Sequence, residues 1–273
     1  MYRFVLPFLI ISIGAAFACA ADLPPSLNAG FRQMYSLDFQ GAHKTFESWQ
    51  AIHPDDPLGP VSNAAAFLFG EFDRLHILDL ALFENNKKFE DRDKVPSDPA
   101  VKAAFETELS RAEDLAGKIL KNSSKDRDAL FASLLAQGLR GYYAGLIEQQ
   151  NRAALNFLKA SRSTAEKLLE IDPEYHDAYL AIGVENYLLG LRSAPMRWAL
   201  RISGAQTDKE KGLASIAVTA DKGHYLAPYA QLLLVIGALR NHDQNTAIRI
   251  LAELAREFPD NSRYQAELLR LQS

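Results

Sequence analysis

An Asp-Pro joint near the middle of the chain separates two apolar segments and leaves little room for a linker. One apolar stretch ends at Ile171, Pro173 follows, and a second stretch begins at Tyr179. Proline lacks a backbone N–H and disfavours helix in the residue before it, so it ends one helix and can open the next. The joint therefore predicts helices that pack side by side, and we find no convincing alternating strand pattern in the sequence.

The composition is that of an ordinary globular protein with a slight excess of acidic residues. The 273-residue chain is 48% hydrophobic and 23% charged, and its net charge is −4. A protein that binds nucleic acid would usually present a basic face. We therefore expect no nucleic-acid partner. The length is sufficient for one large core or for a stack of helical repeats.

Residues 1–20 have the features of a secretory signal peptide. Arg3 supplies a positive start, an apolar run of about 14 residues follows, and Ala18-Cys19-Ala20 provides a small-x-small cleavage pattern. The run is short for a membrane span. We predict cleavage after Ala20 and export to the periplasm or cell envelope. Two alternatives stay open: an uncleaved anchor, or a lipoprotein in which Cys19, the single cysteine, carries a lipid anchor.

Small, aromatic and proline residues form a spaced pattern near the start of the mature chain, within residues 26–54. Gly30, Ala42, Phe46 and Pro54 are separated by 12, 4 and 8 positions. Small side chains let two antiparallel helices approach each other, and an aromatic ring can fill the groove beside them. The pattern predicts a helical hairpin that ends at the proline.

Similar patterns occur near residues 225–259 and, less regularly, near residues 174–204. In the C-terminal copy, Ala247 takes the small position and Leu251 takes the place of the aromatic residue. In the central copy, Gly183 takes the small position of the first helix. The three copies do not share one register, so the intervening helices must differ in length.

These residues resemble the tetratricopeptide repeat, a helix–turn–helix unit of about 34 residues. Good matches cover about a third of the chain. The block from Tyr179 through Trp198 to the Gly212–Leu234 stretch also looks like exported bacterial repeat proteins, whose role is generally unassigned. The resemblance implies an all-α, irregular solenoid of helical hairpins that forms a single domain over residues 21–273. It also implies a surface that binds a protein or peptide, and it supplies no catalytic residue.

Longer elements are predicted between the hairpins. Asp98 and Pro99 form a helix start signal, with Asp at the N-cap and Pro at the first helical position. Thr207 and Glu210 have the spacing of a capping box. The elements predicted in these regions are helices over 63–83, 99–121, 128–149, 151–171 and 207–221, and an exposed charged loop over 87–98.

No constellation of catalytic or metal-binding residues stands out in the sequence. The six histidines are scattered, no pair has the His-x-x-x-His spacing, and the single cysteine lies in the predicted signal peptide. There is no glycine-rich phosphate loop and no G-x-S-x-G motif. We therefore predict no metal, no cofactor and no enzymatic activity.

Tyrosine and arginine residues are the candidates for binding a partner. Three arginines and Trp198 fall within ten residues, a density that suits an anionic or peptide partner. The alternative is that Trp198 is buried and the arginines pair with nearby acids. Repeat geometry, as the resemblance implies it, adds residues on the first helix after Pro173. The candidates are Tyr142, Tyr143, Asp177, Leu180, Val184, Tyr187, Arg192, Arg197 and Arg201.

Three functions are consistent with these patterns. The first is an exported scaffold or adaptor whose open concave face binds a protein or peptide in the cell envelope. The second is a periplasmic carrier with an enclosed apolar pocket, near Phe67, Tyr142 and Tyr187, for a small apolar or amphipathic ligand. The third is a divergent enzyme, which would need two close carboxylates with shifted pKa values in a cleft. The first is the leading expectation.

Overall fold

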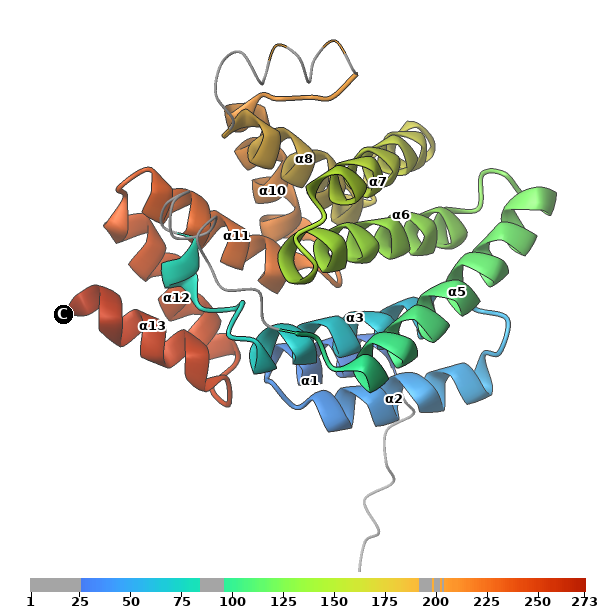
Figure 1. Cartoon of the computed structure of the whole chain (residues 1–273), viewed down its shortest axis with the longest axis horizontal. Coiled ribbons are helices and arrows are strands. Elements are labelled where there is room, and N and C mark those ends of the chain that lie inside the picture. The colour runs from blue at the N-terminus through green and yellow to red at the C-terminus, as the bar shows by residue number, and fades with distance from the viewer. Residues whose placement is uncertain (1–25, 84–95, 192–197, 199–201, 203) are drawn as a thin grey trace, which may run out of the picture.

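The structure, a computed structural model, describes residues 26–83, 96–191, 198, 202 and 204–273 (Figure 1). Regular structure in these residues is helical throughout, which confirms the predicted all-α fold. Three short helical turns are η1 (Leu80–Leu82), the π-helical η2 (Tyr143–Ile147) and η3 (His176–Ala178). The eleven α-helices of these ranges are α1 (Leu27–Tyr35), α2 (Phe39–Ile52), α3 (Leu58–Arg74), α5 (Pro99–Asn122), α6 (Arg127–Tyr142), α7 (Asn151–Ile171), α8 (Tyr179–Gly190), α10 (Lys209–Lys222), α11 (Ala227–Arg240), α12 (Gln244–Glu257) and α13 (Ser262–Gln272).

Each of these helices packs against the next one along the chain, so the fold is an all-α solenoid. Figure 1 shows α1, α2, α3 and α5 on one side of the molecule and α6, α7, α8 and α10 on the other. The C-terminal helices α11, α12 and α13 lie along the third side. The order of packing follows from short connections, which favour antiparallel neighbours.

Side-chain caps explain where several helices begin. Asp98 accepts the Ala100 N–H at 2.8 Å, with Pro99 at the first helical position, as the sequence predicts for α5. The start of α10 differs by one residue from the predicted capping box. Asp208, and not Thr207, is its N-cap and accepts the Lys211 N–H at 3.1 Å.

Two helices that the sequence predicts as continuous are shorter in the structure, and a residue with left-handed backbone follows each of them. The predicted helix 63–83 ends at Arg74, and His76 has a φ of 56°. The predicted helix 128–149 changes to the π-turn η2 after Tyr142, and Gln149 has a φ of 58°. This backbone region is costly for residues other than glycine, so local propensity does not predict it. Of the predicted charged loop 87–98, residues 87–95 lie outside the described ranges.

The first hairpin, α1 with α2, is built around a glycine that makes room for an aromatic ring. Phe46 of α2 is fully buried. A Cβ atom added at Gly30 of α1 would lie 2.3 Å from Cε1 of that ring, so no larger residue fits without movement. In the C-terminal hairpin, α11 with α12, Ala247 and Leu251 are likewise fully buried.

The central hairpin is formed by α8 and α10, so its second helix lies beyond residue 204, where the sequence analysis ends it. Here glycines bring two backbones together. A Cβ at Gly183 would lie 2.8 Å from the Gly212 carbonyl oxygen. A Cβ at Gly212 would lie 2.5 Å from the Tyr187 backbone nitrogen.

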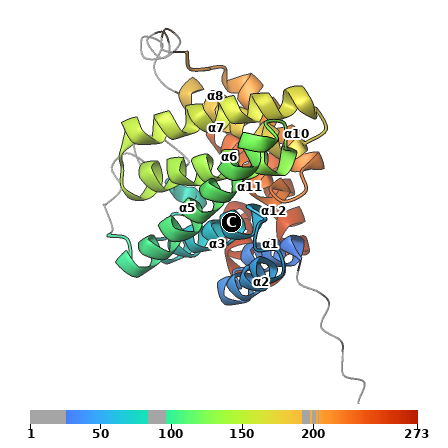
Figure 2. The same ribbon diagram turned by 90° about the vertical axis from the view of Figure 1, so that its right-hand side faces the viewer.

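The first and last hairpins lie side by side, as both views show (Figures 1 and 2). Arg32 of α1 donates to the Glu257 carboxylate of α12 at 3.0 Å. The Asn261 side chain, which caps α13, donates to the Tyr35 carbonyl oxygen at 2.8 Å. The ring of Tyr35 also packs edge-on against Phe258. The two ends of the described helical array are therefore in contact.

Among the described residues, no helix combines the length and the hydropathy that a bilayer crossing needs. The predicted signal peptide (residues 1–20), its Cys19 and the cleavage point after Ala20 lie outside the described residues.

Candidate functional site

An apolar pocket lies where residues 75–83, which we call the strap, cross near α6, α8 and α11. The pocket has a volume of about 100 Å³. By the same measure, a single water molecule needs about 10–15 Å³, so the pocket can hold a ligand of several heavy atoms. The lining residues are Phe72, Ile77, Leu78, Leu80, Phe83, Tyr142, Leu146, Val184, Tyr187, Leu188, Leu191, Ile216, Tyr229, Leu232, Leu233, Ile236 and Arg240.

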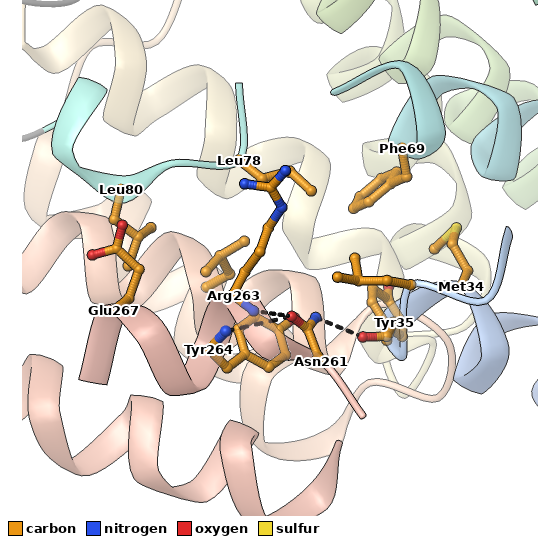
Figure 3. A pocket seen from close by; sticks show the side chains of 11 residues that line it. Met34, Tyr35, Phe69, Leu78, Leu80, Asn261, Arg263, Tyr264 and Glu267 are labelled. Atoms are coloured by element: carbon orange, nitrogen blue, oxygen red, sulfur yellow. Dashed lines mark hydrogen bonds between the residues drawn. The ribbon is translucent and has the colours of Figure 1, made fainter. Parts of the chain in front are cut away.

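The strap separates this pocket from a second, smaller cavity, which Figure 3 shows from close by. Leu78, Leu80 and Leu232 line both spaces. The smaller cavity has a volume of about 20 Å³, which is enough for about one water molecule. In the figure, Arg263 extends from α13 toward Leu78 of the strap. We therefore regard the larger space as the ligand site and the smaller one as a packing gap behind it.

Arginines from the C-terminal helices hold both ends of the strap. Just before its start, Arg263 donates to the Asp73 carbonyl oxygen at 2.8 Å and to the Asp73 carboxylate, and in its middle the same side chain donates to the Asp79 carboxylate at 2.6 Å. At its end, Arg240 donates to the Phe83 carbonyl oxygen at 2.7 Å. The strap thus lies across the pocket as a tethered segment without a long helix of its own.

Three tyrosine hydroxyls and one guanidinium are the polar groups of the pocket lining. Tyr142 and Tyr229 pack edge-on, with ring centroids 5.8 Å apart, and their hydroxyls hydrogen-bond to each other. The Tyr187 side chain is only 4% exposed. Among the described residues, no group hydrogen-bonds to its Oη. Arg240 lies at the end of α11 on the same pocket.

Burial raises the pKa values of these hydroxyls further above neutral pH. It raises the pKa of Tyr142 to about 12, and it also raises the pKa values of Tyr229 and Tyr187. The positive charge of Arg240 acts on the Tyr187 pKa in the opposite direction, and more weakly than burial. At neutral pH these hydroxyls are uncharged, so Arg240 is the one charged group among the described residues that line the pocket.

The structure places three of the predicted partner-binding residues in this pocket: Tyr142, Val184 and Tyr187. Of the residues expected near the pocket of a carrier, Phe67 lies elsewhere, with its ring 4.0 Å from that of His43. Leu188 also lines the pocket and is 40% exposed, which marks a side open to solvent. The pocket is therefore not fully enclosed.

The other predicted residues lie apart from the pocket. Tyr143 is buried and stacks on Phe105, with ring centroids 5.0 Å apart. Leu180 is buried. Asp177 is 2% exposed and accepts three backbone N–H groups, from residues 224–226, so it joins η3 to the start of α11. The remaining three, Arg192, Arg197 and Arg201, lie outside the described residues.

Arg240, Tyr229 and the strap complete the pocket, and sequence reasoning did not assign them to a site. The sequence does single out Arg240, because this charged residue ends a run that is almost wholly apolar from Tyr229 onward. No local pattern indicates the strap, since its tethers come from residues 157 and 190 positions away along the chain.

Buried carboxyls are not paired in a cleft in the described parts of the chain. Burial raises the pKa values of Glu108, Asp128, Asp177 and Glu185, but none of these side chains lines the pocket. Glu185 is fully buried and pairs with Arg162. The searched residues also contain no cluster of His, Cys, Asp and Glu suited to a metal ion.

No protein-family model matches the chain, and a search of curated proteins finds no match to its sequence.

Proposed function

We propose that the protein is an exported, tetratricopeptide-like binding protein that holds a small apolar or amphipathic ligand in the pocket beneath the strap. Binding, and not catalysis, is its role. The observation that carries this proposal is the pocket itself, whose walls are apolar except for three tyrosines and one arginine. Apolar concave sites with a few placed polar groups are typical of ligand sites.

The surroundings of the pocket support a carrier more than an open peptide groove. Tyr143, Leu180, Val184 and Tyr187, expected on a free concave face, are at most 6% exposed. The signal-like residues 1–20 and the repeat-like spacings support export and tetratricopeptide kinship. An exported carrier would take up its ligand from the solvent side marked by Leu188.

The test is a calorimetric titration of the purified protein with indole, a small neutral apolar probe. Leu233 lines the pocket, and its neighbour Leu234 does not, although both are partly buried on α11. Leu233→Trp should fill the pocket and weaken probe binding about tenfold or more, whereas Leu234→Trp should leave it nearly unchanged. Circular dichroism and urea unfolding would establish that both variants fold.

Equal binding of the probe to the wild type and to Leu233→Trp would contradict the proposal, and so would an equal loss in both variants. Mass spectrometry of an organic extract of the freshly purified protein adds an independent measurement. An apolar molecule recovered from the wild type, and not from Leu233→Trp, is the expected result.

A second candidate function is docking to a protein or peptide, which one observation favours. Trp198 is 69% exposed and Ile202 is 68% exposed, and two large apolar side chains so far in solvent are typical of a contact surface. Affinity capture from envelope extracts tests it. A partner held by the wild type and by Leu233→Trp, but lost from Trp198→Ala, would establish docking as separate from the pocket.

A further inference from the structure

The polar atoms around the pocket are either already in use or shielded from it. Tyr142 and Tyr229 hydrogen-bond to each other through their hydroxyls. Tyr187 Oη has almost no accessible surface, so a ligand does not reach it. Arg240 donates to the Phe83 carbonyl oxygen and has a further interaction besides. The surface that a ligand would touch is therefore almost wholly hydrocarbon.

A charged or hydrogen-bonding ligand would give up its water in such a pocket without gaining a partner. A polar group that is buried unpaired costs free energy, and an unpaired charge costs much more. None of the described residues that line the pocket is acidic, and the one cation among them is engaged by the strap. These costs select a ligand that carries no charge and places no hydrogen-bonding group in the pocket.

The size and the walls of the pocket match a single ring. Its volume is about 100 Å³. An engineered protein cavity of about 150 Å³, lined by leucine, isoleucine and phenylalanine, binds benzene. Aromatic rings pack well edge-on or offset against one another. Five of the described lining residues are aromatic: Phe72, Phe83, Tyr142, Tyr187 and Tyr229.

Resting on the proposed function, we infer that the ligand is an uncharged aromatic hydrocarbon, or a close analogue, of about the size of toluene. Its ring lies among Phe72, Tyr142 and Tyr229, which line the pocket from three different helices. A long-chain amphiphile does not fit, because its chain exceeds the volume of the pocket and its head group meets no available partner in the described lining.

The first test compares toluene with phenol, which carries a hydroxyl in place of the methyl group, by calorimetric titration of the wild type. Octanol can hydrogen-bond to a solute and an alkane cannot, so the alkane discriminates more strongly against phenol. The ratio of the two affinities should lie near the ratio of their partition coefficients from water into an alkane, at least about tenfold above the ratio for octanol. A ratio equal to that for octanol would reveal a polar partner in the pocket and overturn the inference.

The second test measures the size of the site with alkylbenzenes from benzene to n-butylbenzene, by displacement of indole. Each added carbon that is buried in the pocket should raise the affinity about fourfold. The rise should level off before butylbenzene, because the pocket is then full. Leu233→Ala enlarges the pocket and should move this limit to a longer chain, whereas Leu234→Ala, outside the lining, should leave it in place. A steady rise through butylbenzene in the wild type would contradict a site of one ring.

Three outcomes separate the ligand class from the proposed function. If indole binds and toluene shows only the advantage over phenol expected from octanol, the class is wrong while the pocket proposal stands. Sodium decanoate tests the amphiphilic alternative: binding tighter than that of toluene, lost in Leu233→Trp, would also overturn the class alone. If the wild type binds neither indole, toluene nor decanoate, the proposed function itself fails.

Discussion

The first hairpin and the central hairpin both use glycine to bring helices together, yet different atoms occupy the contact. In α1 with α2, the space beside Gly30 is filled by the ring of Phe46. In α8 with α10, the space beside Gly212 is filled by backbone atoms of α8, and the space beside Gly183 is filled by backbone atoms of α10 together with the Ile216 side chain. A side chain can be replaced by a smaller one, but a backbone cannot. The two contacts should therefore differ in how a substitution at glycine can be compensated.

The largest effect is expected at the backbone contact of the central hairpin. Gly212→Ala would place its Cβ 2.5 Å from the Tyr187 nitrogen, so α8 and α10 must separate. Overpacking against a backbone belongs at the upper end of the usual range, about 3 kcal/mol, and the better helix propensity of alanine offsets about 1 kcal/mol. We expect a net loss of about 2 kcal/mol in the free energy of unfolding, measured by urea denaturation.

The same substitution should weaken the ligand pocket, because Tyr187 lies in its wall. Tyr187→Leu introduced into Gly212→Ala is the control, since it leaves the backbone clash in place. Recovery of stability in that double variant would show that the contact depends on side chains after all.

A second prediction concerns the strap, where the N-terminal part of the chain meets α13. Arg263→Gln removes the donors to Asp73 and to Asp79. The Asp79 side chain is 41% exposed, so solvent screening lowers the effect, and we expect a loss of about 1–2 kcal/mol. Hydrogen exchange of the amides of residues 75–83 should rise more than that of α8. Arg270→Gln, which removes the pair with Glu267 within α13, is the matched control.

A smaller effect is expected at the first hairpin, where a second substitution should restore part of the lost stability. Gly30→Ala should cost about 1 kcal/mol, because the Phe46 ring must shift while the helix gains propensity. Phe46→Leu removes the ring atoms that the new Cβ would meet. The double variant should therefore be more stable than the sum of the two single effects predicts, as a double-mutant cycle would show. Additive effects would remove the distinction between the two hairpins.

The smallest expected effect is a pH dependence of stability that arises within the N-terminal helices. Glu108 of α5 accepts a hydrogen bond from Asn63 of α3 at 3.2 Å, and burial raises its pKa above the ordinary value of 4.5. A carboxyl whose pKa is raised on folding makes the protein less stable as pH rises through the interval between the unfolded and folded values. Glu108→Gln removes this loss, so the variant should gain on the wild type from pH 4.5 upward, by about 1 kcal/mol or less.

Glu170→Gln, at an exposed position of α7, is the control for this comparison and should show no such trend. Parallel stability curves for wild type and Glu108→Gln between acid and neutral pH would contradict the prediction.

Local sequence signals predict the helices well and their distant contacts poorly. The spacing of Gly30, Ala42 and Phe46 predicts the first hairpin because those residues meet within one helix pair. The helix start at Asp98 depends on neighbouring residues alone, so the sequence predicts it equally well. The strap and the pocket are not, because the partners of Arg240 and Arg263 are far apart in sequence.

In the candidate site too, the sequence indicates some of the residues but not the contacts that bring them together. Tyr142 and Tyr187 attract attention as tyrosines on helical faces, but a repeat pattern assigns them to an open surface. Their burial depends on how α11 and the strap come to lie over them, which only the full packing decides. A polar group left without a partner, such as Tyr187 Oη, is likewise visible only in coordinates.

The meeting of the first and last hairpins fixes the number of units that this array can contain. Open arrays can be lengthened or shortened by whole repeats, because each unit touches only its neighbours. Here an additional hairpin inserted anywhere between them would move Arg32 away from Glu257 and Tyr35 away from Asn261. The molecule should thus vary through its loops, and not through gain or loss of repeats.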